Sequence, residues 1–271
     1  MLFYKKITLK KDKIKMRIVV KIGTSTLAYP TYRLNIRLVE ELCKTLSDLK
    51  NAGHEIVMVS SGAIGMGTGK LMLTSRPKDL PTKQAAAAVG QCELMYTYDK
   101  QFSEYNHTVG QILLNNSDVQ NEERHTNFKN TITRMLELGV IPIVNENDTV
   151  STSEILIGDN DTLSAIVASS IRADLLVLLS DIDGLYTADP HKDPEAKLIP
   201  VVEEVTPEIF GLAAGSGSDL GTGGMVTKLH AAQICTEVGT DMVITNGKNL
   251  AALYTLAEGG SIGTRFLGKK A

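Results

Sequence analysis

Short apolar runs alternate with longer segments of helical periodicity along almost the whole chain. The runs at 17–23 and 174–184 are continuous and apolar, as expected of strands that are buried on both faces. The segment 34–53 repeats its apolar residues at helical spacing and ends in Ala52-Gly53, a typical helix stop. By the same criteria strands are predicted at 17–23, 54–67 (entering a glycine-rich turn), 108–115, 140–148, 174–184 and 241–247, and helices at 34–53, 83–105, 127–139, 162–173 and 224–239.

This alternation predicts an α/β fold with a mainly parallel sheet covered by helices on both faces, a three-layer αβα sandwich. The chain has 271 residues, of which 43% are hydrophobic and 22% charged, a composition that suits one domain with a sizeable core. Residues 1–15 are Lys-rich without a long apolar core or a cleavage site, so we expect a flexible leader, or a short first strand, rather than a targeting peptide. Residues 16–271 are expected to form a single domain.

Composition argues against several partners. The net charge of −3 and the lack of Trp give no support for binding nucleic acid or an anionic membrane surface. No apolar run approaches the roughly 18 residues of a membrane span. Cys43, Cys92 and Cys235 are far apart and form no metal-binding spacing, which favours reduced, mostly buried thiols in a reducing compartment such as the cytoplasm.

Polar clusters follow most of the predicted strands. They read KIGTS, VSSGAIG, VNENDT, LLSDIDG and ITNG. Turn chemistry explains any one of them. In open α/β sheets, however, ligands bind outside the carboxyl ends of the strands, so five such clusters predict a site along one edge.

Two clusters combine glycine with lysine. Lys21 lies in an apolar strand just before Gly23, so it either pairs with an anion or extends its ammonium group to the sheet edge. The stretch 219–233 runs from a glycine-rich loop into a helix with Lys228 in its first turn, a combination typical of phosphate sites. The preceding segment, residues 213–219, could fold over a bound ligand.

Two further clusters can be interpreted either as ligand-binding sites or as ordinary loops and turns. The stretch 59–69 matches neither the dinucleotide fingerprint nor the Walker loop, and is either an anion site at a helix start near Gly62 or a surface loop. Residues 144–150 contain amides and carboxylates that suit a small zwitterion, or form a polar turn. In the GDND of 158–161, one acidic residue would suffice to cap the next helix, and Asp159 is the candidate.

These motifs, in their residues and in their order along the chain, resemble those of the amino acid kinase family, specifically its glutamate-phosphorylating members. The matching segments, from about residue 17 to 265, are VVKIGTS, VSSGAIG, KQAAAAVGQ, VGQILL, PIVNENDTV, IGDNDTLSA, DIDGLYTADP and GTGGMVTKL. The resemblance implies an eight-stranded sheet between helices, in which the half up to about residue 173 binds the amino acid and the rest binds ATP. It further implies transfer of a phosphoryl group from ATP, with Mg²⁺, to the side-chain carboxylate of L-glutamate, as the first step of proline biosynthesis.

Roles for individual residues come from the same resemblance. Catalytic roles fall on Lys21 and Lys228, which would contact the transferring phosphoryl group, and on Asp161, which would orient both lysines. Glutamate would be held by Ser61, Gly62, Asp148 and Asn160. ATP would be bound by Lys21, Gly23, Thr24, Ser180, Asp181, Thr222, Gly223, Gly224, Met225, Thr227 and Lys228, and no side chain is expected to bind the metal directly.

The resemblance leaves several properties as expectations. Proline is a candidate feedback inhibitor, glutamyl phosphate reductase a candidate partner, and a homodimer or homotetramer the expected assembly. Bacterial members often carry a further C-terminal domain of the PUA type, and we expect this chain to resemble the form without that domain. Bacterial members also have Lys where this chain has Leu156. The alternatives are a family member acting on acetylglutamate, aspartate, carbamate or UMP, or a non-catalytic sensor with the same fold.

Overall fold

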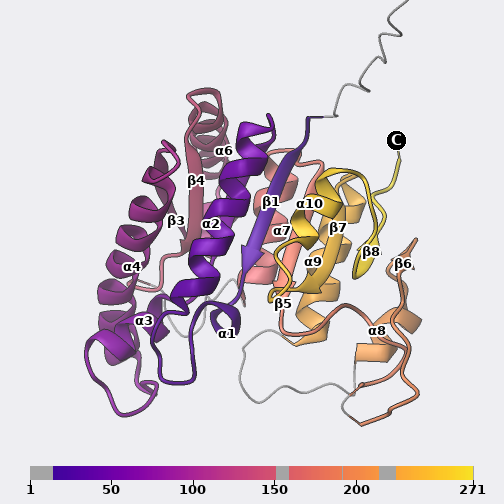
Figure 1. Ribbon diagram of the computed structural model, residues 1–271, viewed down its shortest axis with the longest axis horizontal. Helices are drawn as coiled ribbons and strands as arrows, with labels where there is room; N and C mark the ends of the chain where they lie inside the picture. The colour runs from indigo at the N-terminus through magenta and orange to yellow at the C-terminus, as the bar shows by residue number, and fades with distance from the viewer. Residues whose placement is uncertain (1–14, 151–158, 191, 214–223, 271) are drawn as a thin grey trace, which may run out of the picture.

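A computed structural model describes residues 15–150, 159–190, 192–213 and 224–270, and these residues form one eight-stranded sheet with helices on both faces (Figure 1). The strands are β1 (Arg17–Ile22), β2 (Glu55–Ser60), β3 (Val109–Leu114), β4 (Ile141–Glu146), β5 (Leu175–Ser180), β6 (Val201–Val202), β7 (Asp241–Asn246) and β8 (Thr264–Phe266). The helices are α1 (Thr24–Leu27), α2 (Ile36–Asn51), α3 (Ala63–Lys70), α4 (Leu80–Ser103), α5 (Asn116–Gln120), α6 (Glu122–Glu137), α7 (Asn160–Ser170), α8 (Pro207–Ala213), α9 (Met225–Glu237) and α10 (Ala252–Ala257). The predicted fold class is confirmed.

The strand order is β3-β4-β2-β1-β5-β7-β8-β6. All neighbouring pairs are parallel except β7 and β8, which are antiparallel. From β1 the chain first builds the sheet outward through β2, and later returns to place β5 on the other side of β1. The direction of winding therefore reverses between β1 and β5, and such a switch point is where open α/β sheets bind ligands.

Alternation along the strands divides the core into two layers. Val20 of β1 packs with α2, α4 and α10 on one face of the sheet, whereas Val19 packs with α6, α7 and α9 on the other. Lys21 is two residues after Val19 and therefore lies on the α7 and α9 side. This placement decides which helices can supply its partners.

Helix α3 decides between the two interpretations of the glycine-rich stretch after β2. Residues 63–70 are helical with Gly62 as the N-cap residue, so the helix start near Gly62 is present and the surface loop is wrong. A Cβ on Gly67 would lie 1.8 Å from the carbonyl oxygen of Ala86, and one on Gly90 would lie 1.8 Å from that of Ala63. The glycines therefore allow α3 and α4 to pack backbone against backbone, which a local reading of the sequence does not reveal.

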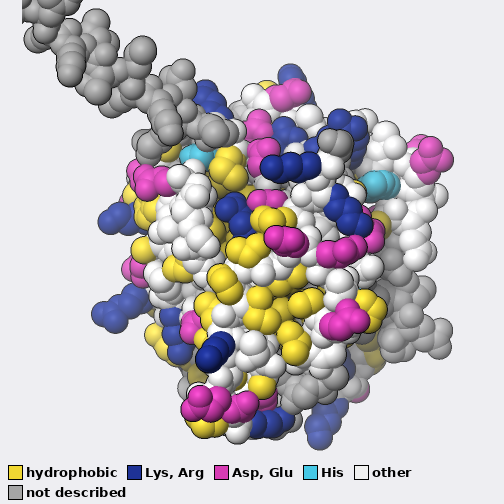
Figure 2. Space-filling model, turned by 90° about the vertical axis from the view of Figure 1, so that its right-hand side faces the viewer, with side chains coloured by type: hydrophobic (Ala, Val, Ile, Leu, Met, Phe, Trp, Pro, Cys, Tyr) yellow, Lys and Arg dark blue, Asp and Glu magenta, His cyan; other side chains and the backbone are white. Residues whose placement is uncertain are grey.

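The face of the C-terminal half has apolar side chains at its centre and charged ones around them (Figure 2). Strand β6 is the edge strand of this half, and Val201 in it is 43% exposed.

Two of the three cysteines are buried, as the sequence predicted. Desolvation raises the pKa of the Cys43 and Cys235 thiols to about 12, as expected of unreactive core thiols. Cys92 is exposed and so departs from the expected burial. Among the helices in the described ranges, none combines the length and apolar character needed to cross a membrane.

Candidate functional site

The polar clusters predicted to converge do lie at one edge of the sheet. Strands β1, β2, β4, β5 and β7 are mutually parallel, so their carboxyl ends share that edge. The clusters that follow them therefore surround the switch point between β1 and β5. Turn chemistry alone does not explain the side-chain contacts found there.

Asp161 lies between two lysines at this edge. Its Oδ1 is 2.6 Å from Nζ of Lys21, and its Oδ2 is 2.9 Å from Nζ of Lys228. The three residues come from α7, β1 and α9, and they are 1%, 9% and 7% exposed. The expected geometry, one carboxylate bridging both lysines, is therefore present, and the alternative in which Lys21 extends to the sheet edge is wrong.

The electrostatics of this triad favour an anion. Burial by itself opposes ionisation of Asp161, but the nearby ammonium groups of Lys21 and Lys228 outweigh it and lower the pKa of the carboxyl. Two ammonium groups against one carboxylate leave one net positive charge in a nearly water-free setting. Because an uncompensated buried charge is costly, the triad is complementary to a negatively charged ligand.

The start of α9 adds hydrogen-bond donors beside the triad. Gly224 is the N-cap residue and has no side chain with which to occupy the free N–H groups of the first turn. Thr227 donates its hydroxyl to the carbonyl of Gly224 over 2.8 Å and lies 3.2 Å from Oδ2 of Asp161. The helix therefore directs its N-terminus and Lys228 toward the same place, as phosphate sites do.

The turn after β1 lies close to Lys21. Gly23 precedes α1 in extended conformation, and a Cβ at this position would lie 3.5 Å from Nζ of Lys21. Thr24 begins α1, and its Cγ2 lies 3.3 Å from where a Cβ on Gly65 would be. Gly23 thus leaves the backbone open next to the ammonium group.

A second cluster is built from amides and a hydroxyl. Asn160 donates through Nδ2 to Oγ of Ser61 over 2.7 Å and to Oδ1 of Asn145 over 3.0 Å. Its own Oδ1 is buried, and no donor in the described ranges of the chain reaches it. Gly62, which follows Ser61, has φ of +103°, a left-handed conformation that suits glycine and lets the chain turn from β2 into α3. The cluster therefore offers a buried acceptor to a ligand.

Asp148 has an unusual pKa. It follows the end of β4 by two residues, and desolvation, together with the nearby Glu146, raises its pKa from 3.8 to about 6, against the opposing effect of Arg76. A carboxylate in this state is short of positive partners, so a cationic group of a ligand would stabilise its ionised form.

Ser180 and Asp181 lie at the end of β5, the strand on the other side of the switch point. The Ser180 hydroxyl donates to Oδ1 of Asp181 over 3.2 Å. Beside them Asn246 donates to Asp183 over 2.8 Å, and the Tyr186 hydroxyl lies 3.2 Å from the same carboxylate. The polar clusters of the sequence include LLSDIDG and ITNG, but they indicated no role for Asp183, Tyr186 or Asn246 and did not predict their contacts.

The three polar residues that follow Gly158 in the GDND segment make different contacts. Asp159 accepts a hydrogen bond from the Thr162 N–H over 2.8 Å, so its expected capping role is confirmed. Asn160 belongs to the amide cluster and Asp161 to the lysine triad. Met225 is buried at the start of α9. Thr222, Gly223 and Leu156, with residues 214–219, lie outside the described residues.

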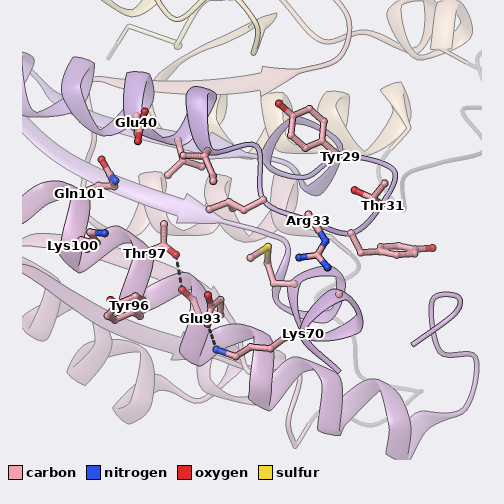
Figure 3. Close-up of a pocket in the computed structure, with 16 residues that line it drawn as sticks. Tyr29, Thr31, Arg33, Glu40, Lys70, Glu93, Tyr96, Thr97, Lys100 and Gln101 are labelled. Carbon is pink, nitrogen blue, oxygen red and sulfur yellow. Dashed lines mark hydrogen bonds and ion pairs between the residues drawn. The ribbon is translucent and has the colours of Figure 1, made fainter. Parts of the chain in front are cut away.

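A separate hollow of about 640 Å³ lies on the opposite side of the sheet, among α2, α3, α4 and the connection from α1 to α2 (Figure 3). Lys70 and Glu93 form an ion pair at its wall, and exposed Tyr96 lies nearby. The triad is on the α7 and α9 side, so this hollow is not part of the candidate site.

Replacing Asp161 by Asn should lower the free energy of unfolding by about 3 kcal/mol at pH 7, because two buried ammonium groups lose their partner. The pKa of Asp161 is lowered in the folded state, so its contribution is present above pH 4 and is lost as the pH falls through the folded pKa. Urea unfolding at pH 7 and at pH 2.5 should therefore show a difference between the two proteins that shrinks in acid. Equal stability at pH 7 would contradict the role given to the triad.

Comparison with known proteins finds relatives along most of the chain. The profile of the Amino acid kinase family matches residues 16–246. The glutamate 5-kinase of Clostridium perfringens is 51% identical over 258 residues, which cover 94% of this chain and 96% of that protein. The glutamate 5-kinase of Caldanaerobacter subterraneus is also 51% identical, over 94% of this chain but 68% of its own length, so relatives differ in length.

Solved structures show the same fold at low sequence identity. The UMP kinase of Bacillus anthracis superimposes with a TM-score of 0.65 at 14% identity, covering 94% of this chain and 97% of that one. Carbamate kinase from Giardia lamblia bound to AMP-PNP gives a TM-score of 0.64 at 16% identity, covering 95% of this chain and 100% of that one. These two structures bear on the fold alone. Since the family profile spans most of the chain and half of the aligned residues are identical to those of glutamate 5-kinases, this chain belongs to the amino acid kinase family.

Proposed function

We propose that this chain transfers the γ-phosphoryl group of ATP to the side-chain carboxylate of L-glutamate, giving L-glutamyl 5-phosphate and ADP, the first step of proline biosynthesis. The observation that carries the proposal is Asp161 held between Lys21 and Lys228 at the switch point. The resemblance to glutamate 5-kinases over 94% of the chain supports the choice of acceptor.

The reaction requires no general base from the protein. A carboxylate is already ionised at pH 7, so one of its oxygens attacks the γ-phosphorus without a general base. The bond from that phosphorus to the β–γ bridging oxygen breaks, and ADP leaves with the electron pair. Alignment and charge neutralisation remain the main tasks, and Lys21 and Lys228 are placed to perform both.

The nucleotide would occupy the side of β5 and α9. The N–H groups that begin α9, at Gly224, Met225 and Thr227, suit phosphate oxygens, as does the open backbone at Gly23 and Thr24. Ser180 and Asp181, at the end of β5, would contact the nucleotide on this side. We extend the same role to Thr222 and Gly223.

Mg²⁺ would accompany the nucleotide. Across the described ranges, no group of three or more His, Cys, Asp or Glu is arranged to hold a metal ion, and Asp161 is engaged by its lysines. Phosphate oxygens and water are ligands that Mg²⁺ accepts readily, and the bound ion would neutralise charge on the phosphates. Its binding therefore fits a site whose protein contribution is made by lysines and N–H groups.

L-Glutamate would lie on the side of β2 and β4. The ionised form of Asp148 and the unpartnered Oδ1 of Asn160 both suit its ammonium group, while Ser61 and the N–H groups near Gly62 suit its carboxylates. The N-terminal half to about residue 173 would thus bind the amino acid, and the C-terminal half would bind ATP.

The family resemblance supports four finer proposals. Proline would inhibit by feedback, a glutamyl phosphate reductase would take up the labile product, the chain would form dimers or tetramers, and it would work in the cytoplasm. Exposed apolar side chains on α2 and α4, such as Ile36 at 61% and Tyr96 at 65%, are compatible with self-association there.

A coupled assay for ADP formation tests the acceptor. With ATP and Mg²⁺, we expect turnover with L-glutamate and little with acetylglutamate, carbamate or UMP, which lack the free α-ammonium group that the amide cluster and Asp148 suit. Aspartate has that group, but its side chain is one methylene shorter, so its carboxylate should be misplaced for transfer and its turnover should also be low. Turnover with another acceptor would assign a different member of the family, and ATP binding without any turnover would favour a sensor. Added proline in the same assay tests inhibition.

Lys228→Ala should lower kcat by about 100-fold or more, since it removes a positive charge aimed at the transferring group. The remaining pair of Lys21 and Asp161 is neutral, so the fold should persist, as circular dichroism can verify. Lys70→Ala serves as the matched control, because Lys70 is exposed and pairs with Glu93 on the opposite side of the sheet. Near-normal turnover of Lys228→Ala would exclude the proposed role.

Asp148 should make glutamate binding sensitive to acid. Its pKa of about 6 means that it becomes protonated as the pH falls from 7 to 5 and loses its attraction for an ammonium group. The KM for glutamate should then rise by up to about tenfold per pH unit below pH 6. In Asp148→Asn the KM should be high already at pH 7 and should lack this dependence; a variant that keeps the wild-type profile would show that another group titrates.

A further inference from the structure

We propose that Gln91 of α4 is a positioning residue for the amino acid substrate, acting through Asn145 on Asn160. The inference rests on the proposed function in taking L-glutamate as that substrate. Gln91 is 8% exposed and accepts a hydrogen bond at Oε1 from Nδ2 of Asn145 over 2.8 Å. Asn145 in turn accepts from Nδ2 of Asn160, so the three amides form a relay.

The relay crosses the edge of the sheet. Asn145 is two residues after Ile143 in β4, and Ile143 packs in the layer of α2 and α4, so Asn145 lies on the α4 side. Asn160 begins α7, which covers the opposite face. The relay therefore connects the two helical layers through the carboxyl end of β4, at the same edge as the switch point and separated from β1 by β2.

A backbone group fixes the direction of every hydrogen bond in the relay. The N–H of Glu146 donates to Oδ1 of Asn145 over 2.9 Å, and a backbone N–H cannot become an acceptor. Nδ2 of Asn145 must then face Gln91, which has to present its oxygen. Asn160 must likewise present its Nδ2 to Asn145, and it uses the same group toward Ser61.

This order leaves Oδ1 as the one group that Asn160 can offer to a ligand. That oxygen is buried and, within the described ranges, has no donor. An acceptor without a partner suits a substrate donor and repels a carboxylate, so it selects the ammonium group of the amino acid. The relay thereby converts a side chain that could face either way into a selective contact.

Gln91 is the residue that completes this arrangement. Asn145 is 1% exposed, so water cannot readily replace Gln91 as the partner of its Nδ2. Without that acceptor, Nδ2 of Asn145 is left buried and unpaired, a cost that competes with the hydrogen bond from the Glu146 N–H that holds the side chain in place. We expect Asn145 to rotate toward another acceptor, which breaks the contact from its Oδ1 to Asn160. Two turns further along α4, the Tyr98 hydroxyl lies 2.8 Å from Oγ of Ser60. The same helix therefore also contacts the end of β2, through a hydrogen bond that does not involve Gln91.

The test compares L-glutamate with glutarate, which has both carboxylates but no ammonium group. Gln91→Met keeps the length of the side chain and removes the acceptor. We expect the KM for L-glutamate to rise about tenfold, equivalent to ~1.4 kcal/mol, while kcat, the KM for ATP and the kcat/KM for glutarate stay close to wild type. The preference for glutamate over glutarate should fall by the same factor.

Two further variants separate positioning from packing. Gln91→Glu retains a carbonyl oxygen for Asn145, so it should restore most of the preference for glutamate. Gln101→Met makes the same change elsewhere on α4, at the wall of the hollow on that side, and should leave every parameter unchanged. If Gln91→Met does not fold, Gln91→Leu removes the same acceptor with a smaller side chain.

The outcomes distinguish this inference from the proposed function. A wild-type protein that does not phosphorylate L-glutamate defeats the proposed function, and crystal structures of wild type and Gln91→Met then decide the relay by the separation of Asn145 and Asn160. Loss of the 3.0 Å contact in the variant supports the positioning role, and its retention overturns it. With an active wild type, an equal loss of kcat/KM for glutamate and glutarate, or no loss at all, overturns it as well.

Discussion

The pairing of one buried carboxylate with two ammonium groups is the constraint on which the site depends. Removing three charges from water is expensive, and the attraction between them compensates only when all three are held in place. Asp161 is 1% exposed and contacts Lys21 and Lys228 through different oxygens. This requirement ties β1, α7 and α9 together at the point where the sheet reverses its winding.

The fold meets that requirement through simple periodicities. The two-residue repeat of β1 puts Lys21 on the same face as Val19, which is the face covered by α7 and α9. Parallel pairing brings the ends of β1, β2, β4 and β5 to one edge, so each connection from strand to helix begins beside the others. The close packing of α3 on α4 at Gly67 and Gly90 places α4 near the same edge.

Two kinds of chemistry adjoin each other at the start of α7. The lysine triad is ionic and carries a net positive charge, whereas the cluster around Asn160 is a neutral network of amides and a hydroxyl. Consecutive residues in a helix point about 100° apart, so Asn160 and Asp161 face different partners although they are adjacent in the chain. Asp159, still in extended conformation, is free to cap the helix. One short segment thereby contributes a side chain to both the neutral cluster and the ionic triad.

The sequence by itself determined the fold class, the order of most strands and helices, and the segments that meet at the site. Continuous apolar strands and helical repeats are local signals, and the motifs of a known family suggested the roles proposed for Lys21, Asp161 and Lys228. The small elements α1, α5, α8, α10, β6 and β8 were not predicted, because their few residues carry little periodicity. Only the tertiary structure decided that residues 63–70 are helical, that Asp183, Asn246 and Tyr186 meet, and that Gln91 reaches Asn145, 54 residues away in the chain. Each of these depends on contacts between distant segments, and on whether a buried polar atom finds a partner, which no local pattern in the sequence encodes.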